Sequence, residues 1–158
     1  MTPPPRQEGG PPIWCGGRKE AAFKRMGRLA DGYVSYVVTP EMYRDALVKI
    51  EQAANEANRK LNNFGTGHLI FTRVDDNYET ALETATSSLS KRYAMDFRRA
   101  AERYAALGNP EDVAAKIFEF HEVGVRHIII DLVGRYENRF HQLERFSAEV
   151  MPLLTALR

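Results

Sequence analysis

The stretch that most constrains the fold joins a short apolar segment to a helix through two glycines. Residues 13–15 (IWC) are apolar, Gly16 and Gly17 follow, and residues 18–29 carry apolar side chains at helical spacing. Paired glycines let the backbone turn sharply and approach a ligand closely. A helix beginning there offers free N–H groups and the positive end of its dipole, which favour an anion such as phosphate. Plain strand-to-helix turns share the pattern, so alone it leaves both interpretations open.

The same strand-to-helix order recurs along the chain. Strands are predicted at residues 13–15, 32–38, 68–74 and 126–132, and a helical segment follows each of them. The last of these has a near-continuous apolar run, which suits a parallel strand covered by helices. Such alternation predicts parallel strands joined by right-handed helical crossovers. Four units form either a small open α/β sheet or half of a (β/α)8 barrel.

Local signals mark where the helices begin and break. Residues 39–41 (TPE) and 109–111 (NPE) each supply a capping side chain, a proline at the first helical position and an acid for the dipole. A long helical region is predicted from residue 75 to about residue 106, with a break at residues 86–88, where helix propensity is weak. In the final helix, residues 137–157, a kink is expected at Pro152.

Composition narrows the class of protein. The 158 residues suffice for one domain with a core, and a formal net charge of +1 argues against a nucleic-acid partner. No apolar run is long enough to span a membrane, and residues 1–12, rich in proline and glycine, lack a signal-peptide core. We read residues 1–12 as an extended segment. Cys15 is the one cysteine, which excludes an internal disulfide and fits a cytoplasmic setting.

Several motifs in series resemble the second half of luciferase-like flavin-dependent monooxygenases. No single motif is specific, but their order and separations match that family over nearly the whole chain. They are PIWCGG (12–17), GRLADGY (27–33), TPE (39–41), YAALGNPEDVA (104–114), GVRHI (124–128) and QLERF with EVMP (142–146 and 149–152).

The resemblance implies a (β/α)8 barrel of which this chain supplies only strands five to eight. A full barrel needs at least roughly 200 residues, more than the 158 present. Residues 13–158 would then be the C-terminal half-barrel, with residues 1–12 similar to the proline-rich segment before strand five. A half-barrel exposes strand edges, so it implies a partner: a second copy in a homodimer, or a missing N-terminal half-barrel.

The resemblance also implies a coenzyme site. Gly16 and Gly17, with Arg18 and Lys19, would hold the phosphate of FMN or of a deazaflavin coenzyme. Backbone N–H groups would do most of the binding, and the two cations would add charge. Relatives often carry a small hydroxyl residue where Lys19 stands, so the hydroxyl donor is lost here. The alternative is that Lys19 is a solvated charge at the start of the helix, with no role in binding the coenzyme.

Three residues at predicted strand ends are candidates for substrate binding. Tyr36 lies toward the end of the second strand and either lines a substrate pocket or packs in the core. Arg73 either meets an anionic group or pairs with Asp75 or Asp76. Asp131 either orients a neighbour by hydrogen bonding or caps the next helix.

The sequence assigns no catalytic residue and no metal site. Two histidines, His68 and His127, are placed before their strands, away from the expected active site, while His121 and His141 lie on helices. No nucleophile-elbow pattern is present. In the family that the chain resembles, many groups that face the flavin ring lie in the half-barrel missing here.

Two functions are therefore compatible with the half-barrel, and a third function would require a different fold. The first is a flavin-dependent oxidoreductase that uses oxygen or, with deazaflavin, transfers hydride, acting on a small organic substrate. The second is a non-catalytic fragment or flavin-binding module whose bare face, near Val34, Ile70 and Ile129 or their alternating neighbours, needs a partner. The third is a flavodoxin-like phosphate-binding domain, with helices on both sheet faces instead of one.

Overall fold

The first two strands and helices form in the predicted order. In a computed structural model, which describes residues 6–7 and 9–155, β1 (Trp14–Cys15) leads into α1 (Glu20–Leu29). β2 (Gly32–Tyr36) then leads into α2 (Pro40–Glu56). β2 is shorter than predicted, because Val37 adopts a φ of 53°, a conformation that ends an extended strand and is rare for a β-branched residue. Of the N-terminal segment, residues 1–5 and 8 lie outside the described part.

The middle of the chain departs most from prediction. β3 (Gly65–Val74) is three residues longer at its start, and α3 (Tyr78–Tyr93) runs unbroken through its serines. The break comes at Ala94, where φ is 53°, before α4 (Arg98–Tyr104). The prediction that helix reaches residue 106 was wrong, because a further strand, β4 (Ala106–Gly108), follows. The described residues thus form five strands where four were predicted.

The C-terminal part returns to the expected order. Asn109 caps α5 (Pro110–Glu122) through a reciprocal capping box, and β5 (His127–Leu132) follows. A 3-10 turn and then α6 (Arg139–Arg145) come next. A π-helical segment, Phe146–Val150, precedes α7 (Met151–Thr155) and ends just before Pro152, where a kink was predicted. Pro152 has no N–H to donate, which favours the wider turn before it.

All strand pairs are parallel, and β3 is the centre of the sheet. β1 pairs with β2, and β2 pairs with the first half of β3. Gly67, His68 and Leu69 of β3 pair with both β2 and β5, so those two strands lie on opposite edges of β3. Thr72 pairs with both β4 and β5, so the short strand β4 lies on the same edge of β3 as β2, beyond the point where β2 ends. The neighbouring order β1-β2-β3-β5 is the one expected of half a barrel.

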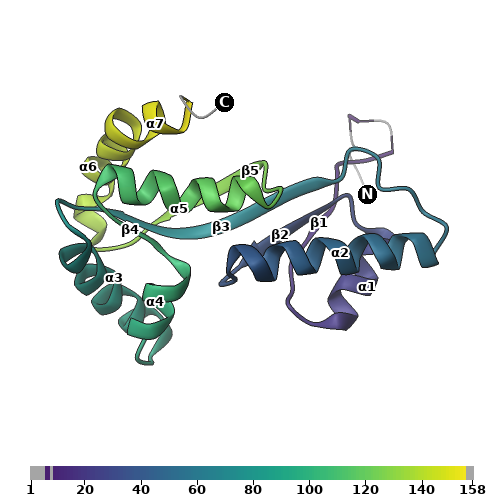
Figure 1. Cartoon of the computed structure of the whole chain (residues 1–158), viewed down its shortest axis with the longest axis horizontal. Coiled ribbons are helices and arrows are strands. Elements are labelled where there is room, and N and C mark those ends of the chain that lie inside the picture. The colour runs from purple at the N-terminus through teal and green to yellow at the C-terminus, as the bar shows by residue number, and fades with distance from the viewer. Residues whose placement is uncertain (1–5, 8, 156–158) are drawn as a thin grey trace.

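The two faces of the sheet are covered differently. Ile70 faces a core cluster with α1, α2, α5 and the C-terminal helical segments, so on β3 it is the alternating neighbours of Ile70 that face the other side. Phe71 faces the other side, where α3 and α4 cover only the end of the sheet. Figure 1 shows β3 running the length of the molecule, with α1 and α2 near its start and α3 and α4 near its end.

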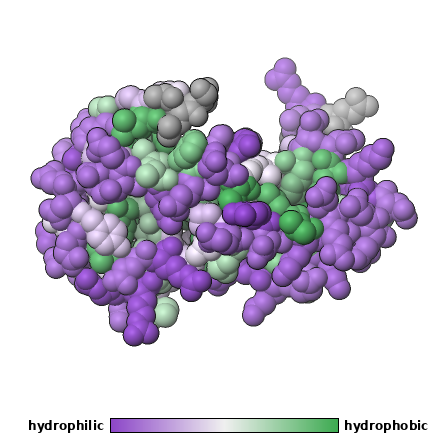
Figure 2. Space-filling view, in the orientation of Figure 1, coloured by the Kyte–Doolittle hydropathy of each residue, from purple (hydrophilic) through white to green (hydrophobic). Residues whose placement is uncertain are grey.

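The rest of the second face is open, and one tryptophan closes its amino end. The Trp14 indole lies where a Cβ at Gly32, Gly65 or Gly67 would collide with it, and it meets His127 edge-on at 5.1 Å. Toward the other end, Ile129 remains 48% exposed. Figure 2 shows apolar side chains at the surface around the C-terminal helices (upper left). No helix in the described part is long and apolar enough to cross a membrane.

Candidate coenzyme-binding site

The glycine loop lies between the carboxyl end of β1 and the start of α1. Its residues, 16–19, are exposed. The first helical hydrogen bonds run from the N–H groups of Ala22 and Phe23 to the carbonyl of Lys19. The N–H groups of the two preceding residues therefore have no partner inside the helix and face outward from its positive end. This arrangement can accept an anion.

The backbone of the loop needs glycine where it turns. Gly17 has a φ of +142°, and a Cβ there would lie 2.6 Å from the Cβ of Ala22. A Cβ at Gly16 would lie 3.3 Å from the carbonyl oxygen of Val34. The turn is supported from below by Tyr33, whose hydroxyl donates to the Gly17 carbonyl at 3.4 Å. Burial raises the pKa of Tyr33 to about 12, so this hydroxyl stays a donor.

The two cations of the loop are differently placed. Arg18 donates from Nη1 to the carbonyl of Val37 at 3.1 Å, which ties the loop to the end of β2. Lys19 is the N-cap residue of α1, and its side chain makes no capping bond. The absence of a hydroxyl at this position, noted in the sequence, thus leaves the helix start uncapped. The loop residues fit a phosphate group: the turn is open, N–H groups are free, and two cations flank it.

A second polar group lies at the carboxyl ends of β2 and β5. Asp131 forms a two-bond ion pair with Arg92 of α3, at 2.7 and 3.4 Å, so it orients a neighbour and does not cap a helix. The Tyr36 hydroxyl contacts that of Tyr93. Burial, followed by this contact, raises the pKa of Tyr36, while the bond to Asp131 raises that of Arg92. Both groups keep their ordinary protonation at neutral pH.

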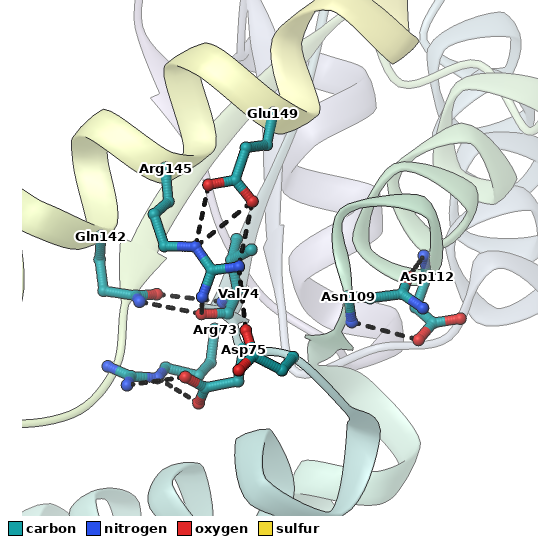
Figure 3. Close-up of polar contacts among 9 residues, drawn as sticks. Arg73, Val74, Asp75, Asn109, Asp112, Gln142, Arg145 and Glu149 are labelled. Carbon is teal, nitrogen blue, oxygen red and sulfur yellow. Dashed lines mark hydrogen bonds and ion pairs between the residues drawn. The ribbon is translucent and has the colours of Figure 1, made fainter.

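The third substrate candidate, Arg73, pairs with an acid at the end of its own strand instead of joining this group. It is only 9% exposed and forms a two-bond ion pair with Asp75, at 2.7 and 3.1 Å (Figure 3). The alternative that Arg73 pairs with a nearby aspartate is therefore confirmed. Of the three candidates, the structure brings Tyr36 and Asp131 to one region, together with two α3 residues that the sequence analysis missed.

The histidines do not form a site. His68 and His127 lie within β3 and β5, so their expected place before the strands was wrong. His68 is fully buried, stacks on Phe120 at 4.0 Å and bonds Ser35 at 2.6 Å. Burial lowers the pKa of His68 to about 4, so the ring is neutral. Among the described residues, no three His, Cys, Asp or Glu side chains gather closely enough to hold a metal ion.

One motif of the resemblance has a structural role. Gln142 of α6 is 2% exposed and bonds both backbone groups of Val74 at the end of β3, at 3.0 and 2.9 Å. Arg145 adds a bond to the same carbonyl and pairs with Glu149 (Figure 3). These contacts fasten α6 to the end of β3, at a residue that pairs with β4 but lies beyond the end of β5.

Comparison with known proteins agrees with this geometry. The family model described as luciferase-like monooxygenase matches residues 1–127. An F420-dependent glucose-6-phosphate dehydrogenase of Microbacterium testaceum is 25% identical over 90% of this chain and 48% of its own length. One from Mycobacterium avium is also 25% identical, over 95% of this chain and 50% of its own. The chain spans about half the length of the curated relatives it matches.

Solved structures share the fold at lower identity. An F420-dependent secondary alcohol dehydrogenase, in complex with an F420-acetone adduct, aligns with a TM-score of 0.76 and 18% identity, over 95% of this chain and 50% of that one. The oxygenating constituent of 3,6-diketocamphane monooxygenase from Pseudomonas putida, in complex with FMN, gives 0.67 and 18%, over 90% and 49%.

Proposed function

Because the chain belongs to the luciferase-like monooxygenase family, we propose that it is the coenzyme-phosphate-binding half of a (β/α)8 oxidoreductase. The observation that supports this most is the glycine loop between β1 and α1. Gly16 and Gly17 would let the backbone approach the phosphate, and the free N–H groups of α1 would donate to it. Arg18 and Lys19 would add two positive charges at the same place.

The remaining residues would shape the substrate side of the site. A flavin-type coenzyme supplies the redox chemistry when bound, as hydride transfer for deazaflavin or as reaction with oxygen for reduced FMN. Tyr36 would line the pocket with an un-ionised hydroxyl, since its pKa is raised. Asp131 would hold Arg92 in one orientation through their ion pair. Asp75 occupies two of the nitrogens of Arg73, so Nη1 would be the atom left to meet another group.

Deazaflavin is the coenzyme we favour, with FMN as the second candidate. The curated relatives at 25% identity are named as F420-dependent dehydrogenases, which supports hydride transfer without oxygen. The diketocamphane monooxygenase complex with FMN supports the oxygen-dependent alternative. Both coenzymes carry a phosphate at the same end of the molecule, so the loop suits either one.

A second half-barrel would complete the site. β1 and β5 are the two ends of the order β1-β2-β3-β5, and in the described sheet each of them, like short β4, has a neighbour on one edge only. The open face between them carries Ile129, which is half exposed. Unpaired parallel edges and an apolar face favour association with another sheet. The other half would be a first half-barrel, or a second copy of this chain in a homodimer.

The test is whether the phosphate matters to binding. FMN and riboflavin, which differ only by that phosphate, are titrated against the chain by flavin fluorescence, with coenzyme F420 as a third ligand. We expect FMN to bind about tenfold or more tightly than riboflavin, because a charge-assisted contact is lost with the phosphate. The double variant Arg18→Gln, Lys19→Gln should weaken FMN binding and leave riboflavin binding unchanged.

The control removes two cations from the same helix away from the loop. Lys24 and Arg25 of α1 are exposed and lie beyond its first residues. Lys24→Gln, Arg25→Gln should leave FMN binding within twofold, since a screened charge one turn away contributes little. Equal affinities for FMN and riboflavin, or equal losses in the two double variants, would reject the glycine loop as the phosphate site.

A further inference from the structure

A polar pocket lies at the opposite edge of the sheet from the glycine loop. It is formed where α3 meets the turn after β5, the other outer strand, at the carboxyl ends of the strands. Its volume is about 490 Å³. The lining residues are Glu83, Thr84, Ser87, Ser88, Lys91, Gly134 and Arg135.

The lining carries an excess of positive charge and hydroxyl groups. Lys91 and Arg135 are both exposed, and neither forms an ion pair within the described part of the chain. Thr84 and Ser87 add hydroxyl donors, and Glu83 is the single acid. Cations left without an acidic partner around a concave, hydroxyl-lined surface are the groups that bind oxyanions.

A buried arginine lies directly behind this lining. Nη1 of Arg73 is buried and makes no hydrogen bond among the described residues, although Asp75 binds its other two nitrogens. A Cβ built on Gly134 would lie 2.9 Å from that Nη1 and 3.5 Å from Thr84 Cγ2. Nη1 therefore lies directly beside Gly134, a residue of the pocket wall. A buried N–H donor without a partner is costly and indicates a missing acceptor.

The backbone of the pocket is held in a form that only glycine suits. Gly134 has a φ of +131°. Its N–H donates to Ser88 Oγ at 3.2 Å, and its carbonyl accepts from the same hydroxyl at 3.4 Å. The turn is thus fixed to α3 by two bonds while no side chain fills the space before Arg73. A built wall with an unused donor behind it is what a binding site requires.

We propose that this pocket binds an oxyanion, a phosphate or carboxylate group, through Lys91, Arg135 and the hydroxyls, with Arg73 supporting it from behind. The site differs from the glycine loop, because the loop follows β1, the pocket follows β5, and β2 and β3 lie between these two strands. This site goes beyond the proposed function, since it adds a second anionic group to the ligands that would bind at the carboxyl ends of the strands. That group belongs either to the substrate or to an acidic part of the coenzyme distant from its phosphate.

The test measures binding of inorganic phosphate to the chain by titration calorimetry. Lys91→Gln and Arg135→Gln should each raise the Kd for phosphate about tenfold, the effect of losing one charge-assisted contact. Both side chains are exposed, so folding should be unaffected. Arg99→Gln removes an exposed cation from neighbouring α4 and should change the Kd less than twofold.

Repeating the titration with saturating FMN separates the two sources of the anion. A second repeat uses saturating F420. A phosphate Kd that neither FMN nor F420 changes supports a substrate anion, whereas competition with F420 but not with FMN supports the acidic tail of the coenzyme. No phosphate binding, or equal effects of Lys91→Gln, Arg135→Gln and Arg99→Gln, overturns the proposal. FMN binding is measured separately with the Arg18→Gln, Lys19→Gln variant. A failure of the oxyanion pocket is therefore distinguishable from a failure of the proposed function.

Discussion

Replacing Gln142 with methionine should destabilise the fold strongly, although the two side chains are similar in size. Gln142 Oε1 accepts from the Val74 N–H at 3.0 Å, and Nε2 donates to the Val74 carbonyl at 2.9 Å. Val74 is fully buried, so water cannot replace either bond. The thioether of methionine satisfies neither group.

The magnitude follows from the two groups left behind. An unsatisfied buried N–H costs about 1–3 kcal/mol. The carbonyl keeps one contact, from Arg145 Nη1 at 3.4 Å, so its loss is smaller. Together we expect the free energy of unfolding to fall by about 2–4 kcal/mol.

Urea denaturation followed by circular dichroism measures this change. Gln52→Met is the matched control, because Gln52 is exposed on α2 and its amide donates to the exposed carboxylate of Glu56. The control should change stability by less than about 0.5 kcal/mol. Hydrogen exchange at the Val74 amide gives a local readout, and exchange should quicken in Gln142→Met. If both variants lose the same stability and the Val74 amide stays protected, the role assigned to Gln142 is wrong.

Three further predictions concern single positions. The pKa of His68 is about 4 in the folded chain, against an ordinary value of 6.5, so the unfolded chain binds the proton more readily. The stability that His68 contributes is therefore full above pH 6.5 and declines as the pH falls toward 4. Urea titrations should show a loss of about 2 kcal/mol between pH 7 and pH 5 that His68→Gln abolishes and His141→Gln, on an exposed side chain, retains. Lys19→Thr should raise the free energy of unfolding by about 1 kcal/mol by capping α1, whereas Lys24→Thr within the helix should lower it. Thermal melts of the two variants measure the difference, and equal shifts in melting temperature would contradict the capping argument. Gly65→Ala should cost about 1–3 kcal/mol by denaturant titration, because its Cβ overlaps the indole of β1; an unchanged midpoint would show that the indole moves freely.

Local signals were the part of the fold that could be predicted. Thr39 and Asn109 cap their helices as expected, because capping depends on residues within one turn. The strand-to-helix order and the resemblance to the luciferase-like family were likewise confirmed. The caps and the elements depend on residues close together in the sequence, and the resemblance depends on several such local motifs in series.

Features set by distant contacts were missed. β4 has only three residues with little strand propensity, and it forms because β2 ends and leaves part of a β3 edge to be paired. α3 continues through its serines because Leu82, Ala85 and Leu89 are buried on one face.

The candidate site shows the same division. The glycine loop is local and was recognised, whereas the pair of Arg92 with Asp131 joins residues 39 positions apart. The role of Gln142 depends on a bond across 68 positions, so its motif was noticed but its purpose was not. No periodicity in a single sequence reports such contacts.

A flavin titration of the purified chain, with its mass in solution read by light scattering at each step, tests the central claim most directly. We expect saturable binding of FMN or coenzyme F420, with the bound form having the mass of two associated half-barrels. A chain that remains a monomer and binds neither coenzyme would contradict the account of a phosphate-binding half-barrel that works with a second half.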